Sequence, residues 1–133
     1  MAYFNKEAYE KLRKDLLEET YGQGAENAEQ DLTFLHGCIT AASDYVREVV
    51  EDQCLRTLRT RTMGTGKIIY LAQEQDRRRH EAHEALIVKV NILNRLAGNH
   101  GAGKIYTGDE NDRYQIGDFA CELVSDIFKN RAL

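Results

Sequence analysis

The sequence predicts an all-α protein, an antiparallel bundle of about four helices with a long central helical hairpin, on three observations. Four segments place apolar residues at helical spacing, and none shows the strict alternation typical of a strand. The chain has 133 residues and no proline, so breaks between helices must come from glycine. Glycine-containing breaks occur at residues 22–24, 64–66, 98–103 and 108–109. The length suits a single helical domain, residues 1–133.

The first two predicted helices span about residues 5–21 and 25–62. Asn5 is a suitable N-cap for the first helix, because its side chain can accept a hydrogen bond from an unpaired backbone N–H of the first turn. Tyr9, Leu12 and Leu16 recur on one face of this helix. The second helix carries an apolar stripe at alternating spacings of four and three: Ala28, Leu32, Leu35, Ile39, Ala42, Val46 and Val49.

The last two predicted helices span about residues 67–97 and 111–131. The third helix carries an apolar stripe in its second half, formed by Leu86, Val90, Leu93 and Ala97. The fourth helix carries Ile116, Phe119, Leu123 and Ile127, with Asp109 or Asn111 placed to cap it. Each of these stripes predicts a helix with one buried face.

The central hairpin is too long for a compact domain of this size. At 1.5 Å per residue its two helices would span roughly 55 and 45 Å, whereas a domain of this length has a radius of gyration of about 14 Å. We expect the hairpin to protrude and to associate with another copy, which makes the protein a homo-oligomer. Apolar residues near the turn but off the pairing seam favour an interface there: Leu55, Leu58, Met63, Ile68, Ile69 and Leu71.

Composition limits the classes of function. The net charge of −4 argues against binding along extended nucleic acid. No apolar run is long enough to predict a membrane partner. The three cysteines, Cys38, Cys54 and Cys121, lack the spacing of a disulfide framework or a zinc site, which favours a bacterial or phage-infected cytoplasm. No cofactor is expected.

The two hairpin helices become polar together toward their turn. In an antiparallel pair, facing residues have numbers that sum to about 130, so Ala42 faces Leu86 in an apolar half. Nearer the turn, Gln53 and Arg56 face a stripe that contains His83, Arg79 and Asp76. The sequence therefore predicts a polar crevice near the expected interface.

Basic residues point to an anionic ligand in that crevice. Residues 53–73 hold four basic side chains and no acid, and arginine suits bidentate contact with phosphate. Arg95 and Arg113 can converge near the start of the fourth helix, where unpaired N–H groups favour an anion. The predicted ligand contacts are Arg56, Arg79, His83, Arg95 and Arg113, with Tyr106 stacking on a base.

An acidic cluster provides an alternative interpretation as a metal site. Asp76, His80 and Glu84 are spaced four apart and share a helix face. Glu48 and Glu51 lie opposite them on the second helix, and carboxylates and histidine facing each other across helices can bind a divalent metal. A metal-dependent all-α nucleotide pyrophosphohydrolase is the first alternative function, although adjacent arginines oppose a cation. A helical protein–protein adaptor is the second.

Five stretches of the C-terminal half carry a family likeness: Arg79–Ile87, Val90–Arg95, Ile105–Asp109, Arg113 and Asp118–Phe119. Over about residues 73–131 they resemble an uncharacterised family of small helical proteins from Gram-positive bacteria and their phages. This resemblance implies a helical fold and no particular activity.

A second likeness concerns one helix end, Leu93-Asn94-Arg95-Leu96-Ala97. It is similar to the Leu-x-Arg-Ala pattern of helical phage proteins that sequester cyclic nucleotide signals of host immunity. Those proteins are small oligomers with basic pockets at their interfaces, so the likeness implies capture of a ligand rather than turnover. We therefore expect a non-enzymatic protein that captures an anionic small molecule, a nucleotide signal, in a basic pocket that depends on the oligomer, with an anti-defence role in a phage or prophage.

Overall fold

The computed structural model describes residues 2–19, 25–62 and 66–131. Over these residues the fold is all-helical, with α1 (Lys6–Glu19), α2 (Ala25–Thr62), α3 (Gly66–Asn99) and α4 (Arg113–Arg131). The bounds of α2 are those predicted, whereas α4 begins two residues later than expected. The only β pairing in this part of the chain is a single bridge between Phe4 and Tyr106.

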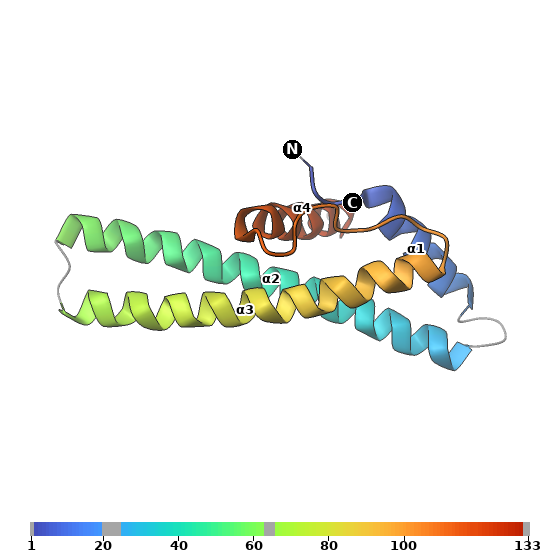
Figure 1. The fold of residues 1–133 in the computed structure, drawn as a ribbon, viewed down its shortest axis with the longest axis horizontal. Coiled ribbons are helices and arrows are strands. Elements are labelled where there is room, and N and C mark those ends of the chain that lie inside the picture. The colour runs from blue at the N-terminus through green and yellow to red at the C-terminus, as the bar shows by residue number, and fades with distance from the viewer. Residues whose placement is uncertain (1, 20–24, 63–65, 132–133) are drawn as a thin grey trace.

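The long hairpin of α2 and α3 forms the body of the molecule. The two helices run antiparallel, and α4 lies along the middle of the pair while α1 covers the end away from the turn (Figure 1). The part of the hairpin near the turn extends past the start of α4, as Figure 1 shows. The predicted protrusion is therefore present in a single chain.

The apolar residues expected at the protruding end are only partly described. Leu58 and Leu71 are exposed and Leu55 is half-buried. Met63 lies outside the described residues, as do the side chains of Ile68 and Ile69. The interface predicted at this end stays a prediction.

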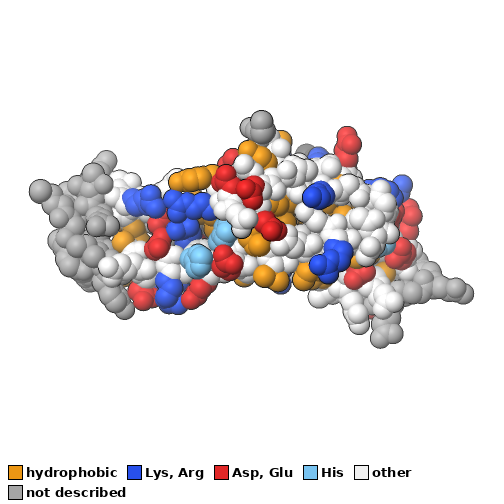
Figure 2. All heavy atoms as spheres, in the orientation of Figure 1, with side chains coloured by type: hydrophobic (Ala, Val, Ile, Leu, Met, Phe, Trp, Pro, Cys, Tyr) orange, Lys and Arg blue, Asp and Glu red, His pale blue; other side chains and the backbone are white. Residues whose placement is uncertain are grey.

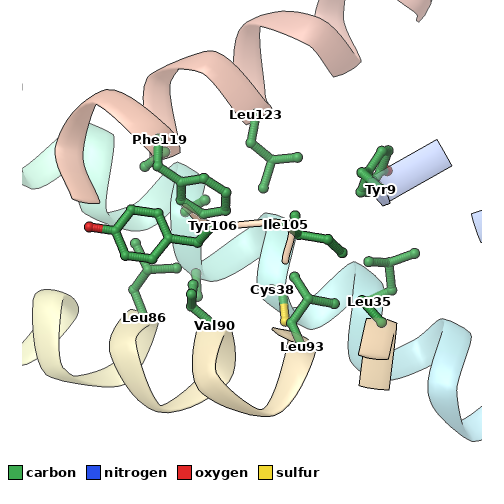
Figure 3. Close-up of a cluster of buried hydrophobic side chains, with 14 of the residues drawn as sticks. Tyr9, Leu35, Cys38, Leu86, Val90, Leu93, Ile105, Tyr106, Phe119 and Leu123 are labelled. Atoms are coloured by element: carbon green, nitrogen blue, oxygen red, sulfur yellow. The ribbon is translucent and has the colours of Figure 1, made fainter. Parts of the chain in front are cut away.

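The core lies where all four helices meet (Figure 3). The predicted stripes supply it: Leu12 and Leu16 of α1, Leu93 of α3, and Phe119 and Leu123 of α4 are all fully buried. Buried side chains of this size each contribute roughly 1.5–3 kcal/mol. The predicted N-cap of α1 is confirmed, because the Ala8 N–H donates to Asn5 Oδ1 at 3.2 Å.

Asn94 holds the segment between α3 and α4 against the core. Its Oδ1 accepts hydrogen bonds from the N–H groups of Ile105 and Tyr106 at 2.9 and 3.1 Å, and its Nδ2 donates to the Tyr106 carbonyl at 3.1 Å. One side chain therefore satisfies three backbone groups of a segment that has no regular secondary structure of its own.

The N-terminal segment packs beside residues 105–107. The Asn5 N–H donates to the Ile105 carbonyl at 2.8 Å, and the Thr107 N–H donates to the Tyr3 carbonyl at 3.0 Å. The carboxylate of Glu122 on α4 accepts from the N–H groups of Tyr3 and Phe4. These bonds join the start of the chain to the loop and to α4, although the residues are about a hundred positions apart.

Asp112, and neither Asp109 nor Asn111, caps α4. Asp112 Oδ1 accepts from the N–H groups of Tyr114 and Gln115 at 2.9 and 3.2 Å. Asp109 instead forms the turn before the helix, with its Oδ1 accepting from the Asn111 N–H at 2.9 Å. The observed cap therefore lies three residues after Asp109 and one residue after Asn111, the two expected caps.

Gly108 occupies a crowded position in that turn. A Cβ at this residue would lie 2.7 Å from the Tyr106 hydroxyl and 2.8 Å from Gln115 Oε1, closer than real contacts allow. The Tyr106 ring cannot move away, because it is buried and its hydroxyl donates to the Asp109 carbonyl at 2.6 Å. Residue 108 must therefore be glycine, because no room is left for a Cβ atom.

The hairpin seam is polar where the sequence predicts it: Arg79 and His83 have side chains only 12% and 11% exposed, and Gln75, which was not predicted, is buried with them. Gln75 is fully buried, and its Nε2 donates to the carbonyl oxygen of Glu48 at 2.8 Å and to the Glu48 carboxylate at 2.6 Å. Asp76, which we expected in the seam, has a side chain that is 61% exposed. The register differs from the expected one by a few residues, and a step of one residue rotates a helix face by about 100°.

The fold contains no helix among the described residues with a stretch both long and apolar enough to cross a lipid bilayer.

Candidate ligand-binding cavity

A half-open cavity of about 400 Å³ lies between α2, α3 and the first half of α4. Residues between Tyr45 and Arg56 of α2 form one wall, and residues between Arg113 and Cys121 of α4 form the other. Arg79 is the contribution of α3. The cavity lies beside the core, at the level where the hairpin begins to project.

Three of the predicted ligand contacts line this cavity: Arg56, Arg79 and Arg113. They come from three different helices, and no local pattern in the sequence connects all three. The face in Figure 2 shows Lys and Arg side chains gathered beside the start of α4, with apolar and acidic side chains around them. The fold therefore brings three distant arginines to one hollow.

Each of these arginines has a polar neighbour. Arg56 Nε lies 2.9 Å from Asp52 Oδ2, and Arg79 Nη2 lies 2.6 Å from Asp76 Oδ1. Only 12% of the Arg79 side chain is exposed, and its Nε is buried without a hydrogen-bond partner within the described protein. The hydrogen bond from Arg79 holds the pKa of Asp76 below its usual value. Arg79 therefore pairs with an exposed acid, whereas the acid paired with Arg56, Asp52, is only 16% exposed.

Arg113 and Tyr114 form a pair at the rim. Arg113 Nη2 donates to the Tyr114 hydroxyl at 2.9 Å, and the guanidinium lies 4.9 Å from the centre of the Tyr114 ring. This hydrogen bond raises the pKa of Arg113 and lowers that of Tyr114. The guanidinium covers one face of the ring, and because Tyr114 is 70% exposed the rest of the ring is accessible to a ligand.

Tyr45 connects the cavity wall on α2 to the start of α4. Its hydroxyl donates to the Arg113 carbonyl at 3.2 Å, and the side chain is fully buried. Burial raises the pKa of Tyr45, and the neighbouring Arg79 guanidinium opposes that rise. This contact fixes the height at which α4 docks and so the position of Arg113 relative to Arg79.

The other predicted contacts lie elsewhere. His83 packs behind the cavity wall with its ring centre 5.6 Å from that of Tyr45, and its Nε2 is buried without a partner within the described protein. Arg95 is exposed on α3 and does not line the cavity. Tyr106, expected to stack on a base, is buried at 3% exposure against Phe119.

Tyr114 occupies the position that we expected Tyr106 to fill. The signal for it was its place directly after Arg113 in the first turn of the fourth helix. Sequence reasoning also missed the valine wall, Val46, Val49 and Val50, because two of these residues were placed in the apolar stripe of the core.

The family model described as "Protein of unknown function (DUF3232)" matches residues 20–133. The chain belongs to the DUF3232 family. This match extends the resemblance expected over about residues 73–131 to the whole hairpin, and it includes every residue that lines the cavity. No curated protein and no solved structure matches the chain.

In this DUF3232 protein the acidic cluster of the alternative metal site does not assemble. Glu48 is bound to Gln75 in the seam, Asp76 pairs with Arg79, and Glu84 lies beside His83. Glu51 lies 3.7 Å from Arg78 instead, and His80 is exposed. Across the described residues, no group of three or more His, Cys, Asp or Glu side chains could hold a metal ion.

Proposed function

We propose that this DUF3232 protein binds an anionic small molecule with a flat apolar part, such as a nucleotide, in the cavity between α2, α3 and α4. The observation that carries the proposal is the convergence of Arg56, Arg79 and Arg113 on one hollow that also has an apolar wall. Its volume lies within the range of small-molecule sites, about 300–1,000 Å³.

The two kinds of surface suit the two parts of a nucleotide. Guanidinium groups offer paired N–H donors in the geometry of phosphate oxygens. The valine wall and the open ring of Tyr114 offer apolar area and a stacking face to a base. A ligand with only one of these parts, inorganic phosphate or a free base, would use half of the site.

The aspartate beside Arg79 does not prevent this binding. Asp76 is 61% exposed, and ion pairs at such exposed positions are worth only about 0–1 kcal/mol. A phosphate can take the place of the carboxylate at little cost, since Asp76 then returns to water.

Capture rather than catalysis is supported by the chemistry of the lining. Cys121 is a nucleophilic side chain in the lining, and burial together with Asp118 raises the pKa of its thiol. A raised pKa leaves less of the thiol in the nucleophilic thiolate form. We extend the proposal to a binding protein of a bacterial or phage-infected cytoplasm, with an anti-defence role and a site that is complete only in an oligomer.

The test is a thermal-shift and calorimetric screen against linear and cyclic nucleotides. A ligand at 100 times its Kd should stabilise the protein by about 2.7 kcal/mol. Arg113→Gln should weaken binding by at least about tenfold, the size of one lost charge-assisted contact of about 1.5–3 kcal/mol. Arg95→Gln, at an exposed arginine outside the cavity, is the matched control and should leave the affinity unchanged.

Two outcomes would contradict the proposal. One is the absence of any nucleotide-dependent stabilisation across the panel, which would favour a helical protein–protein adaptor. The other is an equal loss of affinity in Arg113→Gln and Arg95→Gln. Recovery of the intact nucleotide after denaturation distinguishes capture from hydrolysis, which would return product.

A further inference from the structure

The outward face of α4 presents an exposed stripe that extends beyond the cavity. Tyr114, Asp118, Cys121, Ser125 and Phe128 are all exposed and follow spacings of four, three, four and three. This stripe lies opposite the buried face of the helix. Tyr114 and Phe128, at 70% and 67%, are the most exposed large hydrophobic side chains among the described residues. Exposed aromatic residues at the two ends of one helix face are typical of a protein interface.

We propose that this α4 stripe is a twofold interface with a second copy of the chain, in which the two α4 helices pack antiparallel and cross at Cys121. Tyr114 and Phe128 lie seven residues on either side of Cys121. A twofold axis at Cys121 therefore brings Tyr114 of each copy against Phe128 of the other. One mutual contact at each end of the stripe covers both exposed aromatic residues.

The middle of the stripe permits a close approach of the two helices. Cys121 and Ser125 are small, and Gly117 lies half-buried one turn before Cys121. Helices pack 8–10 Å apart depending on the side chains at the crossing. Asp118 is the one charged residue of the stripe and lies three residues from Cys121. The other central side chains are small and the end ones are large, so the aromatic rings fill the space where two crossing helices diverge.

Charge complementarity favours a second copy of the chain as the partner that binds the α4 stripe. The loop before α4 carries exposed acids, Asp109 and Glu110, and the last turns of α4 carry exposed Lys129. In the antiparallel arrangement the Lys129 of each copy comes next to the acidic loop of the other, once at each end. Arg113, which would oppose Lys129, is folded back onto its own Tyr114 ring. Antiparallel packing also places the partly positive N-terminal end of each helix beside the partly negative C-terminal end of the other, which is favourable.

The interface also bears on the cavity. Tyr114, Asp118 and Cys121 belong both to the stripe and to the cavity lining. A second copy on the stripe would therefore lie over the cavity mouth and supply part of its rim. Only this last step rests on the proposed function; the dimer itself does not require a ligand.

Crosslinking through native cysteines tests the position of the axis without any nucleotide. Cys54 and Cys121 are exposed and Cys38 is buried. Cys54→Ser leaves Cys121 as the exposed thiol, and a short bismaleimide, used in mildly alkaline solution where more of this thiol is ionised, should then convert most of the protein to a covalent dimer. Cys121→Ser is the matched variant and should give little dimer. A dimer formed only through Cys54 would overturn the proposal.

Light scattering at micromolar concentration tests the contacts. The native chain should be a dimer, and Tyr114→Ser with Phe128→Ser should raise the dimer Kd at least tenfold. Val88→Ser with Ile92→Ser removes two exposed apolar side chains of α3 and should leave the Kd unchanged. Lys129→Glu should also weaken the dimer, and Glu110→Lys in the same chain should restore it.

Three results would overturn this interface. A native monomer at these concentrations would exclude it, whatever the nucleotide screen shows. A dimer insensitive to the aromatic pair would place association elsewhere, at the projecting end of the hairpin. A charge swap that fails to restore a dimer weakened by Lys129→Glu would contradict the antiparallel orientation. Failure of nucleotide binding with an intact dimer would contradict the proposed function alone.

Discussion

Single side chains hold the irregular parts of this protein, and Asn94 is the clearest case. Asn94→Ala would leave two N–H groups and one carbonyl of residues 105–106 without their partner. We expect a loss of about 2–3 kcal/mol in the free energy of unfolding, because buried unsatisfied groups cost about 1–3 kcal/mol each and some regain solvent. Urea denaturation measures it. Asn91→Ala, at an exposed site on the same helix, should change stability by less than about 0.5 kcal/mol.

Tyr106 should make stability fall in alkaline solution. Burial raises its pKa to about 12, from an ordinary value of 10.0. Between these two values the unfolded chain loses a proton that the folded chain keeps, so the free energy of unfolding decreases as pH rises from 10 toward 12. For a fully buried group the loss approaches about 2–3 kcal/mol.

The comparison that isolates this residue is Tyr106→Phe. This variant loses the hydrogen bond to Asp109 at neutral pH, but its stability should fall less steeply between pH 10 and 12. Tyr114→Phe removes an exposed tyrosine and should keep the steep fall. Denaturant unfolding at each pH gives the slopes, and equal slopes in Tyr106→Phe and the native chain would refute the assignment.

Among the helices, the start of α4 gives the sharpest test. Asp112→Ala should cost about 1 kcal/mol, the usual value of an N-cap, because it frees the N–H groups of Tyr114 and Gln115. Asn111→Ala, one residue earlier, should cost less than about 0.5 kcal/mol. Thermal unfolding of both variants measures the two losses of stability. A larger loss in Asn111→Ala than in Asp112→Ala would show that Asn111, the cap suggested by the sequence, caps the helix.

The helices themselves could be predicted because their evidence is local. Apolar spacing along α2 and α3 defines each helix without reference to any other part of the chain. The cap of α4 could not be predicted, since three candidate residues stand within four positions and the choice depends on how the Asp109 turn binds Gln115. Gln75 was missed for a related reason: the hairpin register decides which of two neighbouring polar residues turns inward.

At the scale of the whole molecule, the hairpin should be unevenly stable. Residues 57–62 and 66–72 lie beyond the cover of α1 and α4, whereas residues 35–42 and 86–93 lie in the core (Figure 1). Amide hydrogen exchange should be about tenfold faster in the projecting residues than in the core residues, because local opening of the projecting end exposes little apolar area. Equal protection of both sets would mean that another chain covers the projecting end.

Part of the candidate cavity could be predicted from the sequence and part could not. The arginines could be selected by residue type, since phosphate favours guanidinium. Their convergence could not, because it depends on Tyr45 holding the start of α4 beside Arg79. Tyr106 was misplaced in the site because its burial comes from the N-terminal segment, which pairs with it across about a hundred residues.

The crowding at Gly108 has a consequence for how sequences of this family can vary. The residue is only half-buried and sits in a surface turn, a setting in which substitutions are ordinarily tolerated. Its missing side chain nevertheless leaves the room that the Tyr106 hydroxyl occupies. In a saturation mutagenesis screen for folded protein, position 108 should accept alanine poorly and larger residues not at all, while its exposed neighbours Thr107 and Asp109 tolerate several replacements. Natural relatives that carry another residue at this position should have lost the tyrosine as well.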